Sequence, residues 1–127
     1  MKLEHIAFNV TDAPAVAAWY VQHCRLQIVR HIPQPNQTHF LADDDNHTLL
    51  EIYNNRSAPV PDYREMNPLV FHLALQSENA EVDARRFIKA GCTRHSETRP
   101  DANSHLIMLR DPWGLAIQIC QRSPTLV

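Results

Sequence analysis

Short apolar stretches and amphipathic segments follow one another in the same order twice along the chain. Each half opens with an apolar stretch, residues 3–8 or 70–75, and continues with a segment of helical periodicity, near 13–23 or 79–90. Three further runs of strand-forming residues then follow in each half. These predicted strands are 27–32, 37–42 and 47–54 in the first half and 92–98, 103–110 and 115–121 in the second. The pattern predicts an α+β fold made of two βαβββ modules.

An offset of 67 residues relates the two halves. It places His5 on His72 and Glu51 on Gln118, so the same 46 positions separate the histidine from its polar counterpart in each half. The apolar neighbours of these residues follow the same offset. Because a fixed period is the signature of a repeated structural unit, we expect each pair to occupy the same place in its module.

Residues that can cap a helix stand before each predicted helix. Thr11 and Asp12 precede the first, and Ser77 and Asn79 precede the second. Their side-chain oxygens can accept hydrogen bonds from free backbone N–H groups. Gly91 provides a C-terminal stop for the second helix. The faces expected to be buried carry Val16, Trp19 and Tyr20 on the first helix and Ala80, Ala84, Phe87 and Ile88 on the second.

Turn-forming residues close the last hairpin of each module, and a proline-rich segment joins the modules. The sequence Asp-Pro-Trp-Gly at 111–114 suits a type I turn, and residues 44–47 lie opposite it under the repeat offset. Three prolines within 55–68 exclude a helix and favour an extended connector. We therefore predict a single domain, 1–127, in which this connector joins modules 1–54 and 69–122.

Alternation of side chains along the predicted strands separates a polar face from an apolar one. The apolar face must pack against the helices, because it carries no polar side chain; it consists of Ile6, Phe8, Ile52, Leu73, Leu75, Ile117 and Ile119. We expect the opposite face to line the concave side of a curved sheet. The polar residues expected in the middle of strands on that face are His5, Glu51, His72 and Gln118.

These four residues predict a metal site. A carboxylate in the middle of a sheet is costly to desolvate unless it is paired or coordinates a cation. Two imidazoles, one carboxylate and one amide oxygen suit Zn, Ni, Mn, Fe or Co. A divalent ion held by them could polarise a carbonyl and stabilise an enolate. In the alternative interpretation, the same side chains hydrogen-bond to one another or to water in a polar cavity.

Other polar residues near this face are weaker candidates. Tyr53, on the Glu51 face, is expected to contact a substrate, and Asn9, on the His5 face, is a second substrate-binding candidate that could instead form a buried hydrogen bond. Three histidines near strand ends could enter the pocket, but parity across a turn does not fix which face they lie on, and we expect them at the surface. They are His39, His47 and His105.

Composition excludes several classes of protein. Of the 127 residues, 44% are hydrophobic and 20% charged, and the net charge of -2 offers no electrostatic footprint for nucleic acid. No apolar stretch is long enough to span a bilayer, and the first residues lack the pattern of a signal peptide, so we expect a cytosolic protein without a membrane partner. Cys24, Cys92 and Cys120 are widely separated, which favours free thiols.

Several segments resemble the vicinal oxygen chelate superfamily, which includes glyoxalase I, methylmalonyl-CoA epimerase, extradiol dioxygenases and bleomycin-binding proteins. The resemblance covers essentially the whole chain. It is carried by residues 3–12, Trp19-Tyr20, residues 49–53, His72 and, most characteristically, residues 111–119. It implies a curved eight-stranded sheet around a central metal or ligand cavity, a small-molecule substrate and a homodimer. It also implies that the metal ligands are His5, Glu51, His72 and Gln118, a pattern similar to the glyoxalase and epimerase branches.

Two positions depart from the family pattern. The last ligand position is commonly Glu, which in those branches can also act as the base, whereas Gln118 cannot accept a proton. The resemblance therefore shifts the catalytic role to Glu51. Arg25 stands where the family often has a glycine after its first helix, so the turn there must accommodate a Cβ.

Three functions are consistent with this resemblance. The first is a metal-dependent lyase, isomerase or epimerase in which Glu51 moves a proton of an oxygen-chelating substrate. The second is a binding or resistance protein that sequesters a small molecule without catalysis. The third is an Fe(II) dioxygenase, which is disfavoured by Gln118 in the carboxylate's place and by the short chain.

Overall fold

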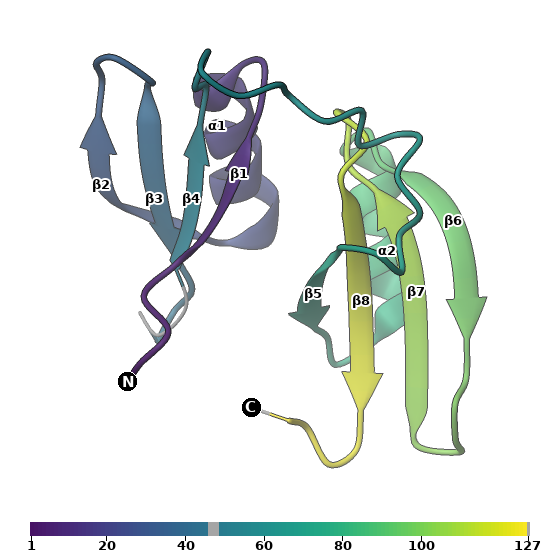
Figure 1. The fold of residues 1–127 in the computed structure, drawn as a ribbon. Helices are drawn as coiled ribbons and strands as arrows, with labels where there is room; N and C mark the ends of the chain where they lie inside the picture. The colour runs from purple at the N-terminus through teal and green to yellow at the C-terminus, as the bar shows by residue number, and fades with distance from the viewer. Residues whose placement is uncertain (46–48, 127) are drawn as a thin grey trace. The chain divides into compact units, whose positions relative to one another are not determined.

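The computed structural model describes residues 1–45 and 49–126, and the chain divides into two compact units, Met1–Pro61 and Asp62–Val127. In each unit one helix lies against one face of a four-stranded sheet (Figure 1). The first unit contains β1 (Ile6–Asn9), α1 (Ala13–Cys24), β2 (Gln27–Ile32), β3 (Thr38–Ala42) and β4 (Leu49–Tyr53). The second contains β5 (Leu73–Gln76), α2 (Ala80–Lys89), β6 (Thr93–Thr98), β7 (Ser104–Arg110) and β8 (Ala116–Arg122). The predicted α+β class and the two βαβββ modules are confirmed.

The hydrogen-bonding register repeats the sequence offset. The strand orders are β1-β4-β3-β2 and β5-β8-β7-β6, with the first pair parallel and the others antiparallel. Ile6 lies opposite Leu50, and Leu73 lies opposite Ile117, which is the same pair moved by 67 residues. Each outer hairpin also has an irregularity, between Ile28 and Arg30 in β2 and between Arg94 and Ser96 in β6, one position short of the repeat offset.

The first strand of each module begins later than predicted. The expected strands 3–8 and 70–75 are observed as β1 from Ile6 and β5 from Leu73, so the prediction that His5 and His72 lie in mid-strand is wrong. Each histidine directly precedes its strand. In the second unit a turn takes up the preceding residues, because Asn67 Oδ1 accepts from the Leu69 N–H at 2.9 Å and Asn67 O accepts from the Val70 N–H at 2.9 Å.

Helix α1 begins and packs as predicted. Asp12 is its N-cap and accepts a hydrogen bond from the Ala15 N–H at 3.1 Å, which satisfies one of the free donors of the first turn. Val16, Trp19 and Tyr20 are all buried. The helix therefore covers the apolar face of its sheet.

Helix α2 follows the same plan with one exception. Asn79 caps it by accepting from the Val82 N–H at 3.1 Å, and Ala80, Ala84 and Phe87 are buried. Ile88 is 40% exposed, so its predicted burial is wrong. It lies at the edge of the apolar stripe, since it stands eight positions after Ala80 and a helix turns by about 100° per residue.

The Asp-Pro-Trp-Gly turn forms as predicted. The Gly114 N–H donates to Asp111 O at 2.9 Å, and the Asp111 carboxylate accepts from the N–H groups of Trp113 and Leu115, both at 2.9 Å. Of the opposite turn, 44–47, Asn46 and His47 lie outside the described residues. Residues 55–68 contain neither helix nor strand.

Two of the histidines expected at the surface are buried. His39 and His105 are each only 6% exposed, so that prediction is wrong for both. His39 donates from Nδ1 to Gln37 O at 2.7 Å, and His105 lies 2.7 Å from a carboxylate oxygen of Glu97. Polar partners make burial possible at both positions. His47 lies outside the described residues.

Candidate metal ligands and a polar pocket

His5 and Glu51 form a pair in the first unit. Glu51 lies on β4 opposite Ala7, and the nearest histidine nitrogen, His5 Nε2, is 3.2 Å from Glu51 Oε2. The other ring nitrogen of His5 contacts the carboxylate of Glu4. Both side chains remain accessible, at 35% for His5 and 20% for Glu51. A carboxylate and an imidazole nitrogen are therefore available together on the sheet face opposite the buried Ile52.

Phe40 completes the surroundings of this pair. It is the β3 neighbour of Glu51, and its ring meets the His5 ring edge to face, with 5.8 Å between centroids. Phe40 was not among the residues predicted for the site. Alternation along the predicted strand 37–42 was the available signal, because it orients every second side chain toward the same face.

His72 and Gln118 occupy the equivalent places in the second unit. Gln118 lies on β8 opposite Ala74, as Glu51 lies opposite Ala7, and His72 directly precedes β5. The Nδ1–H of His72 donates to Pro68 O at 2.8 Å. Since a carbonyl oxygen can only accept, this bond fixes the hydrogen on Nδ1 and leaves a lone pair on Nε2.

Cys120 orients the Gln118 amide. Its Sγ–H donates to Gln118 Oε1 at 3.2 Å. Burial raises the pKa of the Cys120 thiol, so the thiol keeps its proton and remains a donor. The amide oxygen, which is the ligand atom of a glutamine, is thus distinguished from the amide nitrogen. All three cysteines are free thiols, and burial together with nearby Asp111 raises the pKa of Cys92 to about 12.

The two substrate-binding candidates, Asn9 and Tyr53, differ in the hydrogen bonds that their side chains are shown to form within the protein. The Asn9 side chain is buried, donates to Asn55 O at 2.9 Å and to Ala58 O at 3.0 Å, and accepts from the Asn55 N–H at 2.7 Å. These bonds match the alternative of a buried hydrogen-bonded residue. Tyr53 is half-buried on the strand that carries Glu51, two residues beyond it. Its role as a substrate contact stays a prediction.

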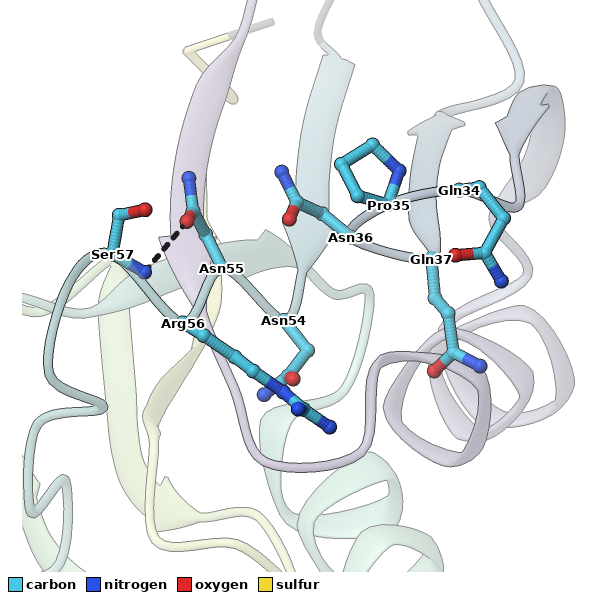
Figure 2. Close-up of a pocket in the computed structure, with 8 residues that line it drawn as sticks. All are labelled: Gln34, Pro35, Asn36, Gln37, Asn54, Asn55, Arg56 and Ser57. Atoms are coloured by element: carbon cyan, nitrogen blue, oxygen red, sulfur yellow. Dashed lines mark hydrogen bonds between the residues drawn. The ribbon is translucent and has the colours of Figure 1, made fainter.

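A polar pocket of about 570 Å³ lies in the first unit. Residues 34–37, between β2 and β3, and residues 54–57, after β4, line it (Figure 2). Its walls carry five carboxamide side chains, one guanidinium and one hydroxyl, and no acidic residue. This pocket was not predicted, because two loops separated in the sequence by strands β3 and β4 assemble it.

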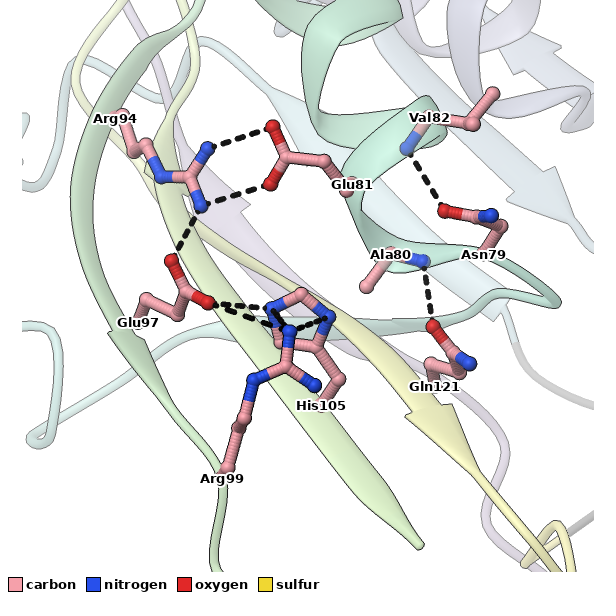
Figure 3. A network of polar contacts seen from close by, with 9 residues as sticks. All are labelled: Asn79, Ala80, Glu81, Val82, Arg94, Glu97, Arg99, His105 and Gln121. Atoms are coloured by element: carbon pink, nitrogen blue, oxygen red, sulfur yellow. Dashed lines mark hydrogen bonds and ion pairs between the residues drawn. The ribbon is translucent and has the colours of Figure 1, made fainter.

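A second group of ligand-type side chains lies in the other unit. Oxygen or nitrogen atoms of Glu81, Glu97 and His105 lie within 4.8 Å of one another. Arg94 donates to both oxygens of Glu81, at 3.2 and 3.0 Å, and to Glu97 at 2.6 Å, while His105 and Arg99 contact Glu97 from the other side (Figure 3).

These contacts make the group an ion-pair network. The hydrogen bond from His105 and then that from Arg94 lower the pKa of Glu97, and the hydrogen bond from Arg94 lowers the pKa of Glu81. Arg94 donates to the carboxylates of both Glu81 and Glu97, and so occupies oxygen atoms that a bound metal ion would need. The network therefore ties the first turn of α2 to β6 and β7.

Comparison with proteins of known structure places the fold. An antibiotic-binding protein, TnmS3, from Streptomyces sp. CB03234 is 16% identical, with a TM-score of 0.72 over 96% of both chains. A glyoxalase family protein from Enterococcus faecalis is 22% identical, with a TM-score of 0.70 over 94% of this chain and 97% of that one. An E144Q mutant of glyoxalase I from Zea mays is 16% identical, with a TM-score of 0.73 over 95% of this chain and 45% of that one.

The family follows from a match along the sequence. No curated protein matches the chain. Neither helix in the described part of the chain has the length and apolar character needed to cross a bilayer. The family model of the Glyoxalase/Bleomycin resistance protein/Dioxygenase superfamily matches residues 2–119. Members of this superfamily commonly bind a divalent metal. The chain belongs to the Glyoxalase/Bleomycin resistance protein/Dioxygenase superfamily.

Proposed function

We propose that the chain is a metal-dependent enzyme of the lyase, isomerase or epimerase type that acts on a small oxygen-chelating substrate. The observation that carries this proposal is the repeated placement of two polar pairs. Each unit presents a histidine directly before its first strand and an oxygen-bearing side chain on the parallel partner strand, opposite an alanine in both cases. In the proposal, the metal ligands are His5, Glu51, His72 and Gln118.

The side chains fit a divalent ion. Nδ1 of His72 is held by a backbone carbonyl, which is the usual support of a metal-binding histidine, and its Nε2 carries the lone pair. Gln118 Oε1 is oriented by the Cys120 thiol. Two nitrogens and two oxygens suit Zn, Ni, Mn, Fe or Co.

Glu51 is the residue that moves the proton. A bound metal would supply electrophilic polarisation of a substrate carbonyl. Glu51 has the only carboxylate among the four residues, is 20% exposed, and can accept a proton from the carbon next to that carbonyl. His5 Nε2 lies 3.2 Å from Glu51 Oε2, so the two ligand atoms lie close enough to share one ion. Tyr53, beyond Glu51 on β4, would contact the substrate.

Binding of a small molecule without catalysis is the second candidate function. Gln118 cannot exchange a proton, which leaves a single carboxylate for a reaction that related branches perform with Glu at this position. The similar structure of an antibiotic-binding protein also supports this alternative.

Metal content tests the proposed ligands. We expect metal in the purified protein, and loss of most of it in His5→Ala and in His72→Ala, since each substitution removes one nitrogen ligand. His95→Ala, at an exposed histidine of β6, is the matched control and should keep its metal. Full metal occupancy in both ligand variants would refute the assignment.

A proton-exchange experiment separates the two functions. Hydroxyacetone, a small oxygen-chelating probe, should exchange its carbon-bound hydrogen with deuterated solvent in the presence of the metal-loaded enzyme. Glu51→Gln keeps an oxygen ligand and should lose this exchange while thermal stabilisation by the probe persists. Stabilisation of the wild-type protein without any exchange would favour the binding function.

We further propose a homodimer that functions in the cytosol, in line with the family resemblance and the three free thiols. Two assemblies satisfy the ligand set, with all four ligands from one chain or with two from each of two chains. Mixing the His5→Ala and His72→Ala proteins distinguishes them. Metal binding returns on mixing only in the second assembly, because the wild-type halves of the two variants then complete one site.

A further inference from the structure

Hydrogen bonds hold the backbone of the two loops that line the pocket, 34–37 and 54–57. Its two loops are joined by a hydrogen bond from the Asn54 N–H to Asn36 O at 2.8 Å. The Asn54 side chain donates to Val10 O at 2.6 Å, and the Ser57 N–H donates to Asn55 Oδ1 at 2.9 Å. The bonds of Asn9 described above hold the backbone of Asn55. These contacts fix the loops before any ligand arrives.

Several polar groups in the pocket are left without a protein partner. Among the described residues, no hydrogen bond or ion pair engages the Arg56 guanidinium or the carboxamides of Gln34 and Gln37. Figure 2 shows these three side chains extending to the same side of the loops. The fixed walls therefore present unused donors and acceptors to the cavity.

The electrostatic character of the pocket is positive. Arg56 contributes the single formal charge among the lining residues, and no carboxylate lines the pocket to neutralise it. A guanidinium offers paired N–H donors whose geometry matches a carboxylate or a phosphate. Each carboxamide offers both a donor and an acceptor, which suits hydroxyl groups.

We propose that this pocket binds a small polyhydroxylated anion, with the oxyanion on Arg56 and the hydroxyl groups on the carboxamides of Gln34 and Gln37. The cavity of about 570 Å³ has the size of a small-molecule site. Its polar lining disfavours an apolar ligand, because burying unpaired amides against hydrocarbon is costly. The site uses none of the proposed metal ligands, so this inference stands independently of the proposed function.

Titration of the full chain with four probes tests the proposal. D-gluconate carries a carboxylate, glucose 6-phosphate carries a phosphate, glucose is neutral, and inorganic phosphate lacks the hydroxyl groups. A chelator is present throughout, so binding at a metal site cannot contribute. Calorimetry gives the affinities, and NMR follows the side-chain N–H signals of Arg56, Gln34 and Gln37.

We expect one or both hydroxylated anions to bind more tightly than glucose and than inorganic phosphate, with gluconate and glucose 6-phosphate showing which oxyanion is preferred. Arg56→Gln should weaken this binding by about tenfold or more, because it removes a charge-assisted hydrogen-bond pair. Gln34→Ala should weaken binding of the hydroxylated anion but not of inorganic phosphate. Arg30→Gln, at an exposed arginine of β2 outside the pocket, is the matched control and should leave the affinity unchanged.

Three results would overturn the inference. They are no binding of either hydroxylated anion, equal affinity for inorganic phosphate and the hydroxylated anions, and equal loss of affinity in Arg56→Gln and Arg30→Gln. Because Arg56 is exposed and makes no contact that the fold needs, its substitution should leave a folded protein. Unchanged unfolding of Arg56→Gln verifies this point.

Discussion

Arg25 adopts a backbone conformation that glycine reaches most readily. It follows α1 as the C-cap with φ 59° and ψ 25°, in the left-handed region. The sequence indicated that a Cβ must be accommodated here, and the structure confirms it. At the end of α2 the second module places Gly91, with φ 101°. A residue at positive φ therefore follows each helix, as the C-cap of α1 and directly after the C-cap Ala90 of α2, and only the first carries a side chain.

Replacing Arg25 with glycine should stabilise the protein. The substitution removes the steric cost of a side chain at positive φ, which exceeds the added flexibility of the unfolded chain. We expect the free energy of unfolding to rise by about 0.5–1 kcal/mol. Urea denaturation measures the change, and an unchanged or lower midpoint would contradict the explanation.

His39, on β3, makes the stability of the folded protein depend on pH. It lies inside the first unit, donates to Gln37 O, and stacks on His31 with 4.2 Å between ring centroids. Burial is the main cause that lowers the pKa of His39 from 6.5, and the neighbouring His31 adds to it, while the hydrogen bond to Gln37 opposes it. The folded protein thus favours the neutral ring.

Stability should therefore fall as the solution becomes acidic. Below pH 6.5 the unfolded chain takes up a proton at His39, whereas the folded chain resists protonation there. The contribution of neutral His39 to the free energy of unfolding is therefore complete above pH 6.5 and is lost as the pH falls toward the lower pKa of the folded state. Unfolding measured between about pH 7 and pH 5 should show a smaller loss in His39→Gln than in the wild-type protein. His95→Gln, at an exposed position, should follow the wild type.

The turn before β8 depends on a close approach of two backbones. Gly114 has φ +99°, and a Cβ built on it would lie 2.8 Å from the backbone nitrogen of Arg64. At Gly91 the φ is similar, +101°, but a Cβ would meet only the Pro112 side chain, whose Cγ lies at 3.2 Å. The two glycines thus share a backbone conformation and differ in what surrounds them.

Alanine substitutions should separate these two effects. Gly91→Ala should cost about 1–2 kcal/mol of stability through the backbone conformation. Gly114→Ala should cost about 2–4 kcal/mol, because the clash with residue 64 adds to the same conformational term. Thermal and urea unfolding of both variants give the comparison, and equal losses would show that the close approach is unimportant.

At the scale of elements, sequence patterns predicted what depends on local chemistry. Asp12 and Asn79 cap the helices as expected, because capping is decided within a few residues. The burial of His39 was missed, because it depends on partners supplied by a bulged neighbouring strand and a tight turn. The alternation rule fixes relative facing along a strand, but not the partners that make a buried imidazole tolerable.

At the scale of the whole molecule, the repeat offset predicted both modules and equivalent places in them for Glu51 and Gln118; the parallel pairing of their strands with β1 and β5 was not predicted. It also predicted equivalent places for His5 and His72, although it placed both inside strands. A repeat carries no information on features that belong to one module alone. The pocket at Arg56 and the ion-pair network around Arg94 are of this kind, and both depend on side chains from segments far apart in sequence.

The irregularities in β2 and β6 also matter for how the protein avoids aggregation. β2 ends its sheet, and Ile28 and Val29 on it are about half exposed, at 49% and 48%. A flat apolar strand in this position would offer a template for the addition of strands from other molecules, the first step toward fibres. The register shift between Ile28 and Arg30 interrupts that template, and the shift between Arg94 and Ser96 does the same in β6. In both modules the strand at this end of the sheet thus carries an interruption of its hydrogen-bonding edge.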